Sequence, residues 1–481
     1  MEISLFSASA VFQGALPHPV FIMTSLGPIF ADDLARVKPG DRLRLTISAQ
    51  TSDAAALAQA ALEARARGER VLVVCADPAD VPRLAQEMPW FEPNLDVRPL
   101  PDWETLPYDV LSPQEELVSE RLEALYRLTA PTGGADVLLT SAVTASQRLS
   151  PVSYIGANTF FFHQGEQISL TTLQKRLAAA GYANVKQVLA AGEFAVRGSI
   201  VDVFPMGSER PFRLDFFDDE IESIRWFDVD TQRSMESAEE IRLLPGHEFP
   251  VDPEALLAFR QRWRREFAGD PKKSIVYCDI EKEILPPGIE YYLPLFFDET
   301  AALTDYLPPN ARVFLLGDIE AALQAFGRDM ASRYKVLAAD PQRPALAPER
   351  IWLKPEEFFK SLANFARFTV EKKENAEDLK CLSGIEVDRK SQNPVGKLLE
   401  RTRESAMKGV RTLIAAPSAG RMETMSQLLR TGGLSVEEFS DWQTFLEADS
   451  SLGISAAPLF SGAVFHHPEI CLLYTSDAAA D

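Results

Sequence analysis

One block of this chain contains three short alternating runs with only turns between them. The runs are Ser199–Phe204, Pro211–Phe217 and Glu220–Phe227. Apolar residues at every second position are typical of strands that bury one face. Pro205-Met206-Gly207 and the acidic corner Asp218-Asp219 supply the turn residues. The block therefore predicts a small antiparallel meander, which leaves its second face to polar side chains.

The polar face of this meander has the composition of a docking surface. Alternation places Arg197, Arg210 and Arg213 on it beside Asp215, and Phe217 ends the second run. No catalytic constellation is visible in the block. A charged face that includes an aromatic side chain is typical of protein-binding surfaces.

The segments around the meander alternate between helix-like and strand-like patterns. An alanine-rich helix at 53–68 is followed by an apolar strand at 70–75, and further strands are expected at 96–100 and 136–140, with a helix at 113–128. This alternation predicts a doubly wound parallel sheet of the RecA/helicase-like α/β class. The fold class is therefore α/β, with a small α+β domain inserted into the sheet domain and a second small α/β domain after it.

The domain boundaries follow from where these patterns change. The sheet domain is expected in two halves, 40–157 and 242–371, around the insertion at 158–241. The charged, apolar-poor segment KKENAEDL favours a linker at 372–385, before the second small domain at 386–470.

Neither end of the chain is expected to belong to the folded domains. Residues 1–39 are expected to be an N-terminal extension. The first 22 residues are mildly apolar but lack the basic start of a secretion signal, and Met23 opens a more ordinary soluble stretch, so Met23 is expected to be the natural start. Residues 471–481 (CLLYTSDAAAD) are expected to be a non-native tail on a truncated domain.

Composition narrows the classes of function. The net charge of −21 disfavours a broad phosphate-binding surface. The four cysteines are far apart, which disfavours both disulfides and a zinc site. No apolar run is long enough to span a membrane, and we expect a cytoplasmic protein.

The sequence lacks the glycine-rich loop that a P-loop ATPase requires. That loop needs backbone amides and a lysine against the phosphates. The corresponding strand–loop–helix, Leu45 to Asp53, reads LTISAQTSD and places Asp53 at a helix N-terminus. Gly396-Lys397 lacks the upstream glycine and the following Ser or Thr. We therefore expect no ATP binding or hydrolysis by this chain, no metal site and no other cofactor.

Several long strings resemble a known family. They are the meander block at 192–234, PDWETLPYD at 101–109, LPGHEFP at 244–250 and GIEYY at 288–292. These strings are similar to the UvrB-like N-terminal region of bacterial transcription-repair coupling factors, from about residue 40 to about 470. In that family the UvrB-like module is a degenerate relative of a helicase.

The resemblance implies a function and a site. It implies that the inserted domain recruits UvrA, the subunit of the excision nuclease, through Arg197, Arg213 and Phe217. It further implies a parent protein that translocates on DNA with ATP and magnesium and displaces stalled RNA polymerase. Contacts with the polymerase and double-stranded DNA would lie in regions outside this chain, and the parent's C-terminal domains would be a further partner.

Two other functions stay open at this point. One is a UvrB-type excision-nuclease subunit, although the short segment Trp103–Leu122 lacks the aromatic hairpin of that protein. The other is an architectural module that holds the parent's motor inactive.

The residue pattern alone also favours less specific roles for the site residues. The two arginines could pair locally with Glu193, Asp215 or Asp218, and Phe217 could belong to the core. The resemblance favours the interface instead.

Overall fold

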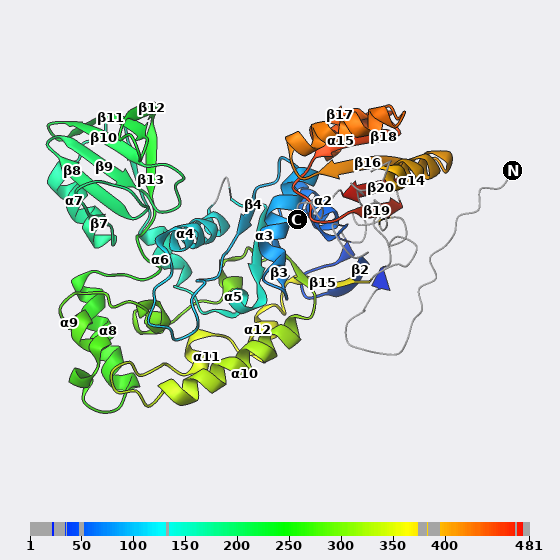
Figure 1. Ribbon diagram of the computed structural model, residues 1–481. Coiled ribbons are helices and arrows are strands. Elements are labelled where there is room, and N and C mark those ends of the chain that lie inside the picture. Colours follow the sequence, from blue (N-terminus) through cyan, green and yellow to red (C-terminus); the bar gives the residue numbers. More distant parts are fainter. Residues whose placement is uncertain are drawn as a thin grey trace.

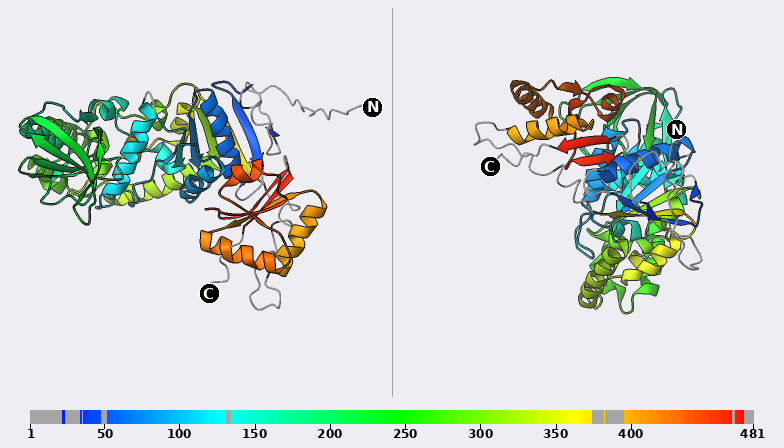
Figure 2. Two further views of the ribbon diagram at one scale, coloured as in Figure 1. Left: turned by 90° about the horizontal axis from the view of Figure 1, so that it is seen from above. Right: turned by 90° about the vertical axis from the view of Figure 1, so that its right-hand side faces the viewer.

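The computed structural model describes residues 22–23, 34, 36–47, 52–130, 134–373, 382, 395–466 and 469–474. It shows three units, which we call the sheet domain, the inserted domain and the C-terminal domain (Figures 1 and 2). The inserted domain lies at one end of an elongated body, and the C-terminal domain lies against the other end. Most of the predicted extension at 1–39 and most of the predicted linker at 372–385 lie outside the described residues.

The sheet domain is built on a seven-stranded sheet in which every neighbouring pair is parallel. Its order is β1-β2-β15-β14-β3-β5-β4. The bounds are β1 (Ile22–Met23), β2 (Arg42–Ile47), β3 (Val71–Cys75), β4 (Val97–Pro99), β5 (Val137–Ser141), β14 (Arg312–Leu316) and β15 (Ala366–Lys372). Strands β3, β5 and β14 are buried at every position, as expected for a parallel sheet covered on both faces.

Helices cover both faces of this sheet. One face packs against α2 (Ser52–Ala66) and α3 (Asp80–Phe91). The other packs against α4 (Glu115–Thr129), α5 (Ala142–Ser146), α10 (Ile319–Leu337) and α12 (Pro355–Ser361). The expected α/β class, with a doubly wound parallel sheet, is confirmed.

The centre of the sheet joins segments from both sides of the insertion. Strand β14 pairs with β3, and β15 pairs with β2. Lys372, which the sequence assigned to the linker, is the last residue of β15. That assignment is wrong because the strand continues two exposed residues beyond its buried part, so its charged end reads as a linker.

The inserted domain follows α6 (Val152–Ala157) and is closed by the pair β6 (Phe160–His163) and β13 (Glu240–Leu243). Its second sheet has six strands in the order β12-β11-β10-β9-β8-β7. The helix is α7 (Leu170–Ala179), and the strands are β7 (Ala183–Asn184), β8 (Glu193–Arg197), β9 (Ile200–Phe204), β10 (Phe212–Phe217), β11 (Glu220–Phe227) and β12 (Ser234–Ala238).

A separate aromatic core joins the loop after β4 to the segment behind the insertion. Trp103 is 3% exposed and donates from Nε1 to Glu248 at 3.3 Å. The described chain between β4 and α4 contains no strand, and so no hairpin. The elements that form this core and its surroundings are α8 (Pro253–Glu266), η1 (Pro271–Lys273), α9 (Ile275–Glu281), η2 (Ile289–Leu295), η3 (Leu303–Tyr306) and α11 (Pro348–Ile351).

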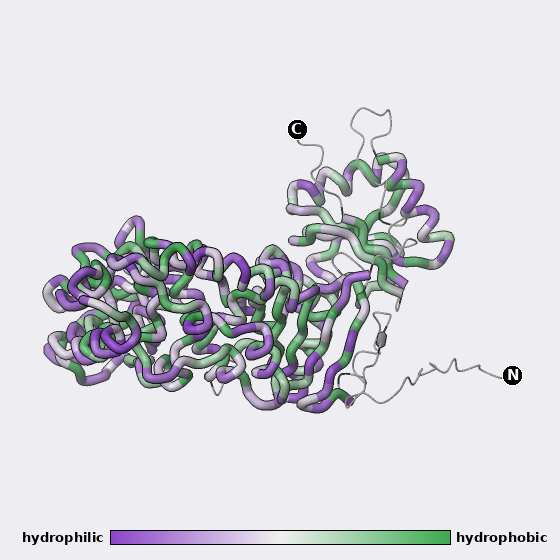
Figure 3. Tube along the Cα trace, turned by 90° about the horizontal axis from the view of Figure 1, so that it is seen from below, coloured by the Kyte–Doolittle hydropathy of each residue, from purple (hydrophilic) through white to green (hydrophobic). Residues whose placement is uncertain are grey.

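The C-terminal domain is a second, smaller α/β unit with strand order β17-β18-β16-β20-β19. Figure 3 shows hydrophobic chain in its central strands and hydrophilic stretches along its helices. Its elements are α14 (Gly396–Met407), β16 (Arg411–Ala416), α15 (Ala419–Thr431), β17 (Glu437–Phe439), α16 (Trp442–Glu447), β18 (Leu452–Ala456), β19 (Ala463–His466) and β20 (Glu469–Tyr474).

Strand β20 extends past the expected end of this domain at residue 470. Residues Cys471 to Tyr474 pair with the central strand β16. Assigning them to a non-native tail is therefore wrong, because Cys471, Leu472 and Leu473 are buried in the domain core. Residues 475–481 lie outside the described residues.

An aromatic cluster fixes the C-terminal domain to α3. The ring of Trp442 lies 5.5 Å from that of Phe91 and 6.0 Å from that of Trp90. The Gln443 side chain donates to the Phe91 carbonyl at 3.1 Å. The two domains therefore share one hydrophobic cluster. Among the described residues, no helix is long and apolar enough to cross a membrane.

Truncating the aromatic side chain at this junction tests how the domains are held. We predict that Trp442→Ala lowers the free energy of unfolding by about 3–5 kcal/mol, since it leaves a cavity among the four other rings that it contacts. Urea unfolding measures this loss. Met407→Ala, in the same domain at a position 84% exposed, is the control and should change stability by less than about 0.5 kcal/mol. Equal stability of the two variants would contradict the account.

His247, which follows the last strand of the inserted domain, should make the stability of the protein depend on pH. Burial lowers the pKa of His247 to about 4 from its ordinary value of 6.5. The unfolded chain therefore takes up a proton at His247 before the folded chain does, so stability falls as the pH falls from about 6.5 towards 4. The expected loss between pH 7 and pH 5 is on the order of 2 kcal/mol.

Urea unfolding at both pH values, for the natural chain and for His247→Gln, checks this prediction. The variant should lack this part of the pH dependence. Identical pH profiles for the two proteins would show that His247 does not contribute to it.

Candidate functional site

The six-stranded sheet of the inserted domain has one core face and one polar face. Phe194, Val203, Phe212 and Leu214 point to the core face, where they share a hydrophobic cluster with Leu173 and Leu177 of α7. The strand register places the alternate residues on the opposite face: Ala195, Asp202 and Arg213 pair across β8, β9 and β10. The predicted meander and its polar face are therefore present.

Asp202 lies at the centre of this polar face and is fully buried. Arg213 binds it with two parallel hydrogen bonds, from Nε to Oδ1 at 2.7 Å and from Nη2 to Oδ2 at 3.0 Å. Arg197 donates from Nη2 to the same Oδ2 atom. One carboxylate on β9 thus holds two arginine side chains, from the strands β8 and β10 on either side of it. The paired bonds of Arg213 have the planar geometry that guanidinium and carboxylate groups favour.

Two loops cover Asp202 from the solvent side. Val188, Ala195 and Phe227 form a small hydrophobic cluster on this face. Gln232 donates from Nε2 to the Val188 carbonyl at 3.3 Å. The carboxylate therefore sits under a local cover, and an unpaired charge there would be costly.

Arg197 and Arg213 differ in the solvent exposure of their side chains. The Arg213 side chain is 14% exposed, whereas that of Arg197 is 48% exposed. The hydrogen bond from Arg213 to Asp202, together with the carboxylate charge, raises the pKa of Arg213 against the opposing effect of burial. Arg197 keeps about half of its surface for solvent or for a partner.

Phe217 is a solvent-facing aromatic residue at the end of β10. It is 69% exposed and pairs with Glu220 across the hairpin. The turn is closed by Asp218 at a φ of 52°, a left-handed conformation that aspartate tolerates better than most residues. The core position that the pattern alone favoured for Phe217 is wrong.

The local partners proposed for the arginines are also wrong. Glu193 accepts hydrogen bonds from the backbone of Leu189 and Ala190, at 2.7 and 3.0 Å. Asp215 accepts one from Ser223 at 2.8 Å. The arginines do pair locally, but their partner is Asp202, which the sequence did not single out.

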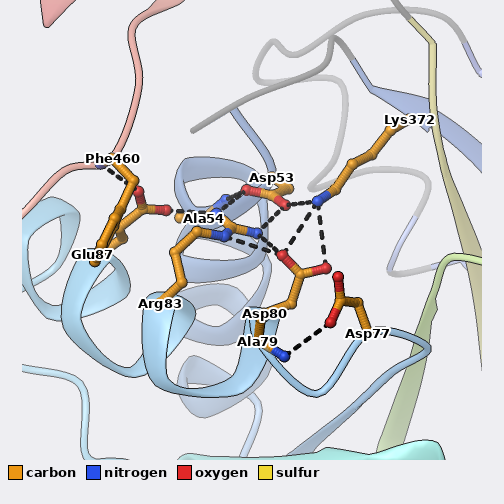
Figure 4. A network of polar contacts seen from close by, with 9 residues as sticks. All are labelled: Asp53, Ala54, Asp77, Ala79, Asp80, Arg83, Glu87, Lys372 and Phe460. Atoms are coloured by element: carbon orange, nitrogen blue, oxygen red, sulfur yellow. Dashed lines mark hydrogen bonds and ion pairs between the residues drawn. The ribbon is translucent and has the colours of Figure 1, made fainter. Parts of the chain in front are cut away.

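The carboxyl edge of the parallel sheet carries a second polar cluster, where a P-loop ATPase would bind phosphate (Figure 4). Asp53, fully buried in the first turn of α2, binds Arg83 of α3 at 2.5 Å and Lys372 of β15 at 2.9 Å. Asp80 contacts the same two cations, at 2.7 and 3.3 Å.

This cluster also reaches the C-terminal domain. Arg83 binds Glu87 at 2.6 Å, and Glu87 accepts a hydrogen bond from the Phe460 backbone at 3.1 Å. Burial opposes the charge on Arg83, but its bonds to Asp53 and the charge of Glu87 raise its pKa overall. Both cations of this cluster are therefore engaged by carboxylates of the chain itself.

Two family models match the chain. The model described as UvrB interaction domain matches residues 160–249, which include the polar face with Asp202. The model described as MFD, D3 domain matches residues 406–477, which include most of the C-terminal domain.

Curated relatives with one shared name also match. The chain is 42% identical over 298 residues to the transcription-repair-coupling factor of Escherichia coli strain K12, which covers 62% of this chain and 26% of that protein. It is 38% identical over 368 residues to that of Haemophilus influenzae, covering 74% and 31%. For that of Bacillus subtilis the values are 32% over 216 residues, 42% and 18%. The matches thus span about a third or less of each relative.

Proposed function

Because the chain belongs to the family of transcription-repair coupling factors, we propose that it is a recruitment module whose inserted domain binds UvrA. The observation that carries this proposal is the polar face itself. It presents a half-exposed arginine and an exposed phenylalanine within the segment that matches the UvrB interaction domain. Arg197, Arg213 and Phe217 form the proposed site.

The chemistry of this face supports protein binding. Arginine and aromatic side chains are enriched among the residues that carry most of the binding energy in interfaces. Asp202 holds the arginines in place before binding, which reduces the entropy that association must overcome. A partner that offers carboxylates and an apolar pocket would be complementary to this face.

We further propose that recruitment serves excision repair at stalled RNA polymerase, as the relatives' shared name implies. Contacts with the polymerase and with double-stranded DNA would then be made by other parts of the longer relatives. The hairpin-free segment between β4 and α4 gives no support to a UvrB-type damage clamp.

Binding of UvrA to the full chain tests the proposal. We expect Arg197→Ala and Phe217→Ala each to weaken binding by at least about tenfold, equivalent to about 1.4 kcal/mol. Isothermal titration calorimetry with purified Escherichia coli UvrA measures the effect.

Arg210→Ala is the matched control, because Arg210 is an exposed arginine of the same domain. Its side chain reaches Glu236 at 3.8 Å and no other charged group among the described residues. It should leave the affinity unchanged. A folded natural chain that does not bind UvrA would contradict the function and favour an architectural, motor-inhibiting module.

We also propose that this chain does not hydrolyse ATP. The support is the cluster at the sheet edge, where Asp53 brings negative charge to the first turn of α2 and binds both Arg83 and Lys372. A nucleotide phosphate would have to displace these internal carboxylates, and it would meet the repulsion of Asp53.

A nucleotide-binding assay checks this proposal. Fluorescently labelled ATP with magnesium should show no saturable binding to the full chain, and the rate of phosphate release should equal that of buffer. Asp53→Ala and Lys372→Ala should leave both results unchanged. Saturable binding that Lys372→Ala removes would instead favour a UvrB-type excision-nuclease subunit.

A further inference from the structure

We infer that Arg197 and Arg225 are the arginines that face the partner, and that Arg213 acts behind them as a positioning residue through Asp202. This inference rests on the proposed function of the same face. It assigns to Arg225 a role that the family resemblance does not give it, and it changes the role of Arg213.

The guanidinium group of Arg213 makes most of its hydrogen bonds inside the domain. Nε and Nη2 bind Asp202, while Nη1 donates to the Gln232 carbonyl and to Ser234 Oγ, both at 3.1 Å. The group also lies 4.9 Å from the centre of the Phe227 ring. Four of the five N–H donors of Arg213 thus have an internal partner, and the side chain is only 14% exposed, so little of it is left for a partner.

Arg225, unlike Arg213, is exposed to solvent. It lies in β11 directly across from Arg213, so the two side chains share the polar face of the sheet. Its residue is exposed, and no hydrogen bond or ion pair joins its side chain to the described residues. Since Asp202 balances the charge of Arg213, the charge of Arg225 is left for solvent or a partner.

The register sets the layout of the exposed groups. Arg197 is on β8 and Arg225 on β11, three strand spacings apart, and the pairing offsets them by two residues along the strands. At roughly 4.8 Å per spacing and roughly 3.4 Å per residue, they are about 16 Å apart. Phe217 lies on β10, between these two strands in the sheet order. Because Phe217 lies at the turn end of β10, beyond the rows of both arginines, the complementary partner surface is two carboxylates on the order of 16 Å apart, with an apolar pocket to one side of them.

Arg213 supports this layout from inside. Its two bonds fix the Asp202 carboxylate, and the Oδ2 atom of that carboxylate accepts from Arg197. Loss of Arg213 would leave Arg197 as the only cation on a buried carboxylate, which would draw Arg197 inwards and away from a partner.

The test is a set of calorimetric titrations of the full chain with Escherichia coli UvrA. Arg225→Gln should weaken binding at least about tenfold and leave the melting temperature unchanged, because the side chain of Arg225 bonds to none of the described residues. Arg225→Lys should recover part of the loss, since it keeps the charge without the planar fork. The control is Arg210→Gln, at the same exposed arginine as in the earlier titrations, with no change expected.

A comparison of single and double variants tests whether Arg213 acts through Asp202 or contacts the partner directly. If Arg213 acts through Asp202, then Arg213→Gln combined with Asp202→Asn should bind within about twofold of the weaker single variant. Two independent contacts would instead give losses that multiply. The same comparison of Arg225→Gln with Arg197→Gln should give multiplied losses.

The outcomes separate the inference from the function on which it rests. A natural chain that does not bind UvrA would overturn the proposed function. A chain that binds UvrA but is indifferent to Arg225→Gln, or that shows multiplied losses for Arg213 and Asp202, would overturn the inference alone. Because Arg225 lies in solvent, its arm of the test stands even if Asp202→Asn unfolds the domain.

Discussion

The buried carboxylate of Asp202 organises the polar face of the inserted domain. It accepts hydrogen bonds from arginines on two neighbouring strands, and local loops shield it from water. A buried charge of this kind is tolerated only while it is paired. The same requirement that stabilises the domain therefore holds Arg197 at the surface and closes Arg213 inside. Stability and recognition depend on one ionic cluster, whereas Phe217 and Arg225 lie on this face without bonding to it.

A second ionic cluster has a comparable effect on the sheet domain. Asp53, Arg83 and Lys372 join the first turn of α2, helix α3 and strand β15, and Glu87 extends the contact to the C-terminal domain. The fold keeps the parallel sheet of a nucleotide-binding protein, but this edge is occupied by internal ion pairs. The proposed loss of ATP chemistry and one of the contacts that dock the C-terminal domain thus come from the same ionic cluster.

The local patterns of the sequence predicted most elements, and what they missed depends on long-range packing. Alternation located β9, β10 and β11 and the polar face, since it requires only neighbouring residues. It did not identify Asp202, because alternation indicates which face a side chain joins but not what covers that face. Strand β15 was missed for a similar reason: its pairing with β2 and β14 joins segments far apart in the chain. The exposure of Phe217 agreed with the family resemblance and not with the pattern.

Hydrogen exchange of the full chain, with and without UvrA, tests the central claim most directly. The account predicts slower exchange in β8 to β11 when UvrA is added, and no change in β2, β3 and β14 of the parallel sheet. Protection confined to the sheet domain or the C-terminal domain, with β8 to β11 unaffected, would contradict it.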